Sequence, residues 1–185
     1  MKGLIGLCRE TFYPEFVEPL QLNRLLATVS KLDATTLGLE DRCQNMNRSS
    51  GWDFEDLLSE DKLHIKLLLI PQGSSIPLHD HPKMSGIIKI IWGKLHLRAF
   101  DWVETFPYSG LSRKHGDLVA DSASAPEIIL PCHKNLHTLY ALEDVAFLDI
   151  FSPDYYNEDR PCTYYEIQEK LQIEGEELFH LTVKK

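Results

Sequence analysis

The chain has 185 residues, 43% of them hydrophobic, and a formal net charge of −9. This length suits one domain, or one domain with a short N-terminal addition, and the hydrophobic content is too high for a disordered chain. The negative charge argues against sequence-independent binding to nucleic acid, because neutralising phosphates requires clustered Lys and Arg.

Cysteine usage and hydropathy indicate a soluble intracellular protein. Four cysteines are present, and no two form a Cys-x-x-Cys pair. Nothing near Met1 has the pattern of a secretory signal, and no apolar run approaches the roughly 20 residues that span a bilayer. We therefore expect a monomer with reduced thiols and no membrane partner, located in the cytoplasm, with the nucleus also open.

Residues 1–60 are predicted to form a helical and irregular N-terminal cap. Leucines recur at helical spacing after Pro19, which predicts a helix over residues 19–32. Residues 42–53 are polar and rich in turn formers, and they predict a loop. No chemistry is assigned to this cap, which we expect to pack on a sheet.

Residues 61–185 are predicted to form a mainly β core. Short apolar runs are separated by Gly, Pro, Asp, Asn or Ser, a pattern typical of an all-β barrel or double sheet. Gly93 and Lys94 predict a hairpin-like turn between two of these strands. The predicted strands are residues 63–70, 87–92, 95–102, 118–120, 127–130, 136–142, 145–151 and 162–167.

A pair of histidines marks a candidate metal site. His79 and His81 are two residues apart on a short extended segment, so their side chains point to the same side. Pro77 and Pro82 hold the flanking backbone out of a helix. Since imidazole is the commonest neutral metal ligand, the two rings are predicted to share one ion.

Such a site needs at least one more ligand. His137, in an alternating strand-like segment, ranks first, and His133, in the preceding turn, ranks second, but spacing alone separates them little. Four further histidines are each more typical of surface or core positions than of a metal site: His64, His96, His115 and His180.

Several motifs resemble those of known cupins. Gly73-x5-His79-x-His81, followed by Gly86 and Gly93, resembles the first cupin motif, with glycine where many cupins have a glutamate ligand. More specifically, residues 60–167 resemble the family of cysteamine dioxygenase and the plant cysteine oxidases. The matching blocks are His79-Asp80-His81-Pro82-x-Met84-Ser85, Gly93-x-Leu95-His96, Phe100-Asp101-Trp102, Asn135-Leu136-His137, Leu148-Asp149-Ile150, Ser152-Pro153-Asp154-Tyr155 and Cys162-Thr163-Tyr164-Tyr165.

The resemblance implies a double-stranded β-helix (cupin, jelly-roll) with an N-terminal helical cap, binding Fe(II) through His79, His81 and His137. It implies a thiol dioxygenase that uses O2 to convert the thiol of an N-terminal Cys, or of cysteamine, to the sulfinic acid. Three neutral ligands would leave the ion its full charge and favour an incoming thiolate.

The same resemblance implies roles for four further residues. Asp149 and Tyr155 would position the substrate, with the Asp149 carboxylate facing the free amine. Cys162 and Tyr164 match a pair that forms a thioether crosslink in the animal enzyme. Asp154 departs from the family pattern, because relatives have a second proline there.

Other interpretations stay open from the sequence. Three histidines also suit a zinc or nickel cupin that acts as a hydrolase or isomerase, or a non-catalytic binding module. Asp149 could be a buried structural carboxylate, and in that case it needs a partner, since an unpaired buried charge is costly. The combination of Asp149, Tyr155 and Cys162 favours the dioxygenase.

Overall fold

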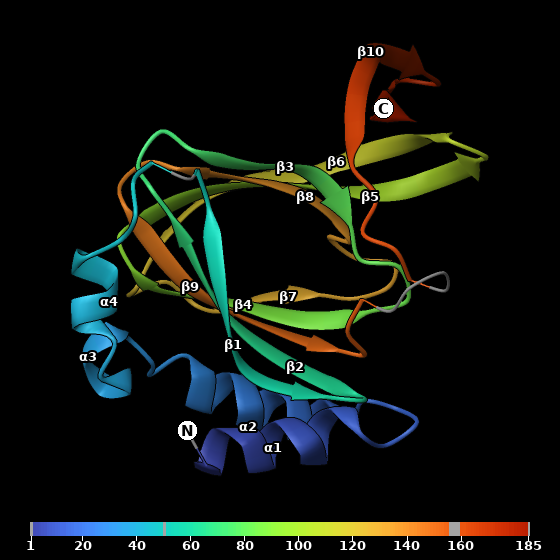
Figure 1. Cartoon of the computed structure of the whole chain (residues 1–185). Coiled ribbons are helices and arrows are strands. Elements are labelled where there is room, and N and C mark those ends of the chain that lie inside the picture. The colour runs from blue at the N-terminus through green and yellow to red at the C-terminus, as the bar shows by residue number, and fades with distance from the viewer. Residues whose placement is uncertain (1, 50, 156–159, 185) are drawn as a thin grey trace.

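Two antiparallel sheets face each other in this computed structural model, which describes residues 2–49, 51–155 and 160–184 (Figure 1). One sheet has the order β1 (Asp53–Glu60), β2 (Leu63–Ile70), β9 (Val145–Ser152), β4 (Ser85–Trp92) and β7 (Glu127–Ile129). The other has the order β10 (Tyr165–Ile173), β11 (Glu176–Val183), β6 (Ser109–Asp121), β5 (Lys94–Phe106), β8 (Leu136–Ala141) and β3 (Ser75–Asp80).

From β2 to β9 the chain changes sheet at every step except β5 to β6. This alternation is that of a double-stranded β-helix, so the predicted fold class is confirmed. Apolar side chains from the two inner faces meet in one core, which includes Leu68 and Ile88 from one sheet and Leu97 and Leu139 from the other.

The predicted hairpin at Gly93 is wrong. Strands do flank it, but β4 and β5 belong to different sheets, so Gly93 lies where the chain crosses between them. Its φ is 71°, and a Cβ added there would collide with the carbonyl oxygen of Asp144. Glycine is therefore required at this corner for both its backbone conformation and its size.

Four helices cover the outer face of the five-stranded sheet in the described part of the chain (Figure 1). They are α1 (Lys2–Phe12), α2 (Pro19–Val29), α3 (Ala34–Leu37) and α4 (Glu40–Gln44). The predicted helix over residues 19–32 is α2. Leu25 and Val29 of this helix pack with Ile65 and Ile150 of the sheet. None of the described helices has the length and apolar character needed to cross a membrane.

The strands begin earlier than the expected boundary at residue 60. Residues 53–60 form β1, which pairs antiparallel with β2, rather than irregular structure. The predicted loop over residues 42–53 contains the end of α4. Because helices cover one face of β2 and β9 and the core covers the other, these strands are apolar along nearly their whole length.

Candidate metal centre

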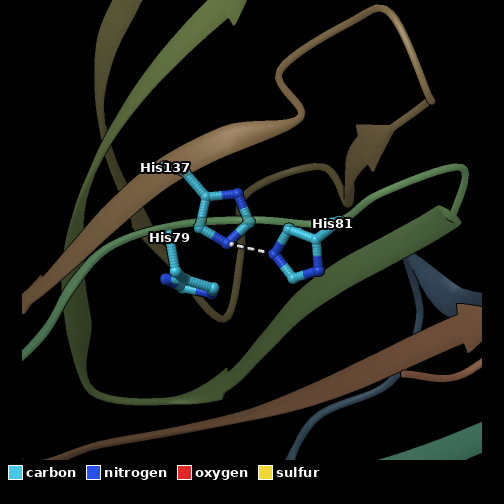
Figure 2. A group of neighbouring side chains, drawn as sticks. All are labelled: His79, His81 and His137. Atoms are coloured by element: carbon cyan, nitrogen blue, oxygen red, sulfur yellow. Dashed lines mark hydrogen bonds between the residues drawn. The ribbon is translucent and has the colours of Figure 1, made fainter. Parts of the chain in front are cut away.

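Strand register brings three histidines together. His79 lies near the end of β3 and is directly opposite His137 of β8. His81 lies just beyond the end of β3, and its ring turns toward the other two (Figure 2). All three residues are buried, with exposed fractions of 7% for His79 and 1% for each of the others.

The ring nitrogens are close enough to share an ion. One ligand atom from each residue lies within 4.8 Å of the others, and the Nε2 atoms of His81 and His137 are 3.1 Å apart (Figure 2). This is about the separation of two nitrogens that are each bonded at roughly 2.1 Å to one ion. The donor set therefore fits a metal.

Hydrogen bonds at Nδ1 fix which nitrogen faces the shared point. His79 Nδ1 donates to the carbonyl of Pro77 at 2.8 Å, and His137 Nδ1 lies 3.4 Å from the carbonyl of Lys134. His81 Nδ1 lies 2.6 Å from the Tyr155 hydroxyl, which in turn donates to the Asp80 carbonyl at 2.8 Å. With Nδ1 protonated on each ring, every Nε2 carries its lone pair inward.

Burial keeps the three rings neutral. It lowers the pKa of His79 to about 4 and holds the pKa values of His81 and His137 well below their usual range. For His81 and His137, neighbouring imidazoles add to the lowering of the pKa. Neutral imidazole is the form that binds a metal. His133 does not join this group; it lies beside Asp101 and His115 instead.

Contacts around His81 hold its backbone and ring. The Asn135 side chain donates to the His81 carbonyl at 2.7 Å and accepts from its N–H at 3.3 Å. The Phe151 ring stacks on the imidazole with centroids 4.5 Å apart. Gly86 lies so close to Phe151 that a Cβ there would collide with the ring, so glycine at this position leaves room for the stacked pair.

A cavity of about 190 Å³ opens beside the histidines. Aromatic, aliphatic and charged side chains line it together with two of the histidines: Trp52, Phe54, Lys66, Leu68, Ile76, His79, His81, Asp149, Phe151, Tyr155, Cys162 and Tyr164. The four residues to which the resemblance gives a role beyond the histidines all lie on this wall.

Asp149 is a buried carboxylate without a hydrogen-bond partner on one oxygen. It is 9% exposed, and no described residue hydrogen-bonds to its Oδ1. Burial raises its pKa well above the usual range; the charge of Lys66 opposes this shift and that of Asp154 adds to it. A buried polar atom left unpaired in a cavity is a candidate for binding a ligand.

Cys162 and Tyr164 lie against the same cavity and contact each other. Burial raises the pKa of both side chains. The thioether between them stays a prediction, which the intact mass of the purified protein tests. Residues 162–164 precede β10 instead of forming the start of the strand predicted over 162–167.

The PCO_ADO family model matches residues 22–181. The chain belongs to this family. It is 34% identical over 111 residues to plant cysteine oxidase 1 of Arabidopsis thaliana, a match that covers 57% of this chain and 38% of that protein. It is 33% identical over 129 residues to 2-aminoethanethiol dioxygenase of Mus musculus, covering 57% and 50% of the two chains.

The Homo sapiens 2-aminoethanethiol dioxygenase is 26% identical over 185 residues, which covers 83% of this chain and 68% of that protein. The chain thus spans half or less of the first two relatives' lengths. Among solved structures, a double-stranded β-helix protein of Klebsiella pneumoniae has a TM-score of 0.48 at 12% identity and covers 64% of this chain and 83% of that chain.

Lys66 lines the same cavity but was not predicted from the sequence as a site residue. It lies opposite Asp149 in the register of β2 and β9, and its Nζ is 3.9 Å from Asp154 Oδ1. The signal was present, because His64 and Lys66 are alternate polar residues in an otherwise apolar strand and so share a face. Asp154, where the family resemblance implies a proline, pairs with both.

Proposed function

We propose that this chain is an Fe(II)-dependent thiol dioxygenase acting on a thiol with a free neighbouring amine, either the N-terminal Cys of a peptide or protein, or cysteamine. The observation that carries the proposal is a group of three buried histidines whose ring nitrogens converge, two of which line one cavity with Asp149, a buried carboxylate whose Oδ1 has no hydrogen-bond partner among the described residues. Membership of the PCO_ADO family and similarity to proteins named plant cysteine oxidase 1 and 2-aminoethanethiol dioxygenase support it.

The overall reaction adds both atoms of O2 to the thiol sulfur and gives the sulfinic acid, so no external reductant is consumed. His79, His81 and His137 would hold the iron, which supplies a dication that favours the thiolate form of the substrate and brings it together with O2. The three ligands are neutral, so they leave the charge of the ion available to an anionic substrate sulfur.

Asp149 would select the amine. An ammonium group entering the cavity would supply a charged hydrogen-bond donor to Asp149 Oδ1, which no described residue supplies. The apolar lining, with Leu68, Ile76 and Phe151, excludes water and so strengthens this pairing. A thiol whose amine is acylated offers no charge to Asp149.

Tyr155, which lines the cavity and was expected to position the substrate, would also position His81. Burial raises the pKa of its hydroxyl, which stays protonated and bridges His81 Nδ1 to the Asp80 carbonyl. Tyr155→Phe removes this bridge, and we expect iron affinity to fall about 10–100-fold while the fold is kept. Tyr140→Phe, at an exposed tyrosine of β8, is the matched control. Iron affinity is measured by competition with a chelator. An unchanged affinity in Tyr155→Phe would contradict the role of the Tyr155 hydroxyl in positioning His81.

The amine requirement tests the proposed substrate class. The chain, loaded with Fe(II) without oxygen, is mixed in air with a peptide that begins with Cys and with the same peptide acetylated at its N-terminus. We expect a mass gain of two oxygen atoms on the free peptide and none on the acetylated one. Equal oxidation of both peptides would contradict the role given to Asp149.

A further inference from the structure

A second group of metal-ligand side chains lies outside the cavity. Asp101 of β5, His115 of β6 and His133 in the turn between β7 and β8 each offer one ligand atom within 4.8 Å of the other two. His115 Nδ1 is 3.1 Å from Asp101 Oδ2, and the rings of His115 and His133 are 4.5 Å apart and nearly perpendicular. None of these residues belongs to the centre described above.

A β-bulge and a tight turn bring the three residues together. Ala99 pairs with Gly116 and Phe100 pairs with Lys114, so His115 is the extra residue of a β-bulge. A bulge re-aims the side chain of its extra residue. His133 closes a tight turn, in which it exchanges two backbone hydrogen bonds with Leu130 at 2.9 and 3.1 Å.

An ordinary surface ion pair would account for only part of this cluster. His115 and Asp101 alone would form an exposed pair of small energetic value, and that pair leaves the second imidazole unexplained. The nearby Lys114 and Lys134 are paired with Asp117 and Glu127, so their charges are largely compensated.

We propose that Asp101, His115 and His133 form a second, surface site for a divalent transition-metal ion of the zinc class. Two imidazoles and one carboxylate are a common set of protein ligands for Zn²⁺, with water completing the coordination. The carboxylate compensates part of the ion's charge, which the three-histidine centre does not. The proposal requires neither iron nor dioxygenase activity.

The proposed site is joined to the cavity centre through one short segment. Asp101 Oδ1 accepts the backbone N–H of Lys134, whose carbonyl lies 3.4 Å from His137 Nδ1. The next residue, Asn135, holds the backbone of His81. An ion bound to Asp101 and His133 would therefore clamp the turn that orients two of the three inner histidines.

Zinc stoichiometry tests the site without using activity. The full-length, metal-free chain is dialysed against Zn²⁺ and its bound zinc is counted. We expect about two ions per chain for the natural sequence, about one for His133→Ala and about one for His79→Ala. His96→Ala, at a histidine of β5 that also faces a carboxylate, Asp117, is the matched control and should keep both ions.

Asp101→Asn provides a second variant, because its amide oxygen still accepts the Lys134 N–H while the anionic ligand is lost. It should bind the surface ion at least about tenfold more weakly, with its circular dichroism spectrum unchanged. The proposal is overturned if the natural chain binds a single ion that His79→Ala removes, or if His133→Ala binds as much zinc as the natural chain. Equal loss in His96→Ala would show adventitious surface binding and would also overturn it.

Discussion

Replacing His137 by Ala is expected to remove the bound iron. The variant loses one of three converging Nε2 donors and leaves its partner, the Lys134 carbonyl, without the imidazole N–H. After loading with one equivalent of Fe(II) and gel filtration, the variant should retain at least about tenfold less iron than the natural chain. Its turnover of a thiol should fall by more than about 100-fold, which exceeds the loss expected when a residue that only orients a ligand is altered.

His96→Ala is the control for this experiment. It removes an imidazole from the neighbouring strand β5, where His96 faces Asp117 and lies outside the inner group. We expect normal iron content and turnover in this variant. Full iron retention in His137→Ala would contradict the assignment of the third ligand, and His79→Ala would then show whether the pair alone binds the ion.

Asp149→Asn is expected to lose activity while it keeps its iron. The amide is nearly isosteric with the carboxylate but cannot form the charge-assisted bond to an ammonium group. Breaking such a desolvated pair costs about 2–5 kcal/mol, which is roughly a 30- to several-thousand-fold loss in kcat/KM. The loss should be similar for cysteamine and for a peptide that begins with Cys, because both present the amine.

The same substitution should make the metal-free, substrate-free protein more stable at neutral pH. Burial raises the pKa of Asp149 above its unfolded value, so its favourable contribution is present at low pH and is lost as pH rises through the folded pKa. Asn does not titrate, and its advantage should therefore grow from about pH 4 upward until the pH passes the folded pKa of Asp149.

Urea unfolding at several pH values, together with steady-state kinetics, separates the two roles of Asp149. If the Asp149 carboxylate serves to bind the substrate, Asp149→Asn should be more stable and less active than the natural chain. A destabilised or unfolded Asp149→Asn would instead support a structural role. Full iron with near-normal turnover would remove Asp149 from substrate binding and leave the dioxygenase proposal intact.

The sequence predicted the strands that have a strong local signal. The apolar runs of β2, β4 and β9 are readable because these strands are buried on both faces. In contrast, β1 and β10 are largely exposed, and their polar residues resemble those of loops. No local pattern shows that β4 and β5 separate into different sheets, since this depends on the packing of Gly93 against Asp144.

The candidate metal site could be predicted from the sequence only where its residues are close together along the chain. His79 and His81 are neighbours along the chain, so spacing alone predicts that their rings meet. His137 joins them through the register of β3 and β8, which spacing cannot supply; spacing ranked it only slightly above His133, and the family resemblance separated the two. Among the described residues, the lack of a hydrogen-bond partner at Asp149 Oδ1 depends on how three strands pack and is visible only in the folded protein.

Incorporation of isotopically labelled O2 tests the central proposal most directly. The chain, loaded with Fe(II) in the absence of oxygen, is exposed to labelled O2 with a peptide that begins with Cys, and a zinc-loaded sample serves as the control. We predict that two labelled oxygen atoms appear on the Cys sulfur with Fe(II) and none with zinc. Iron-loaded protein that leaves the thiol unchanged, or converts it only to a disulfide, would contradict the assignment as a thiol dioxygenase.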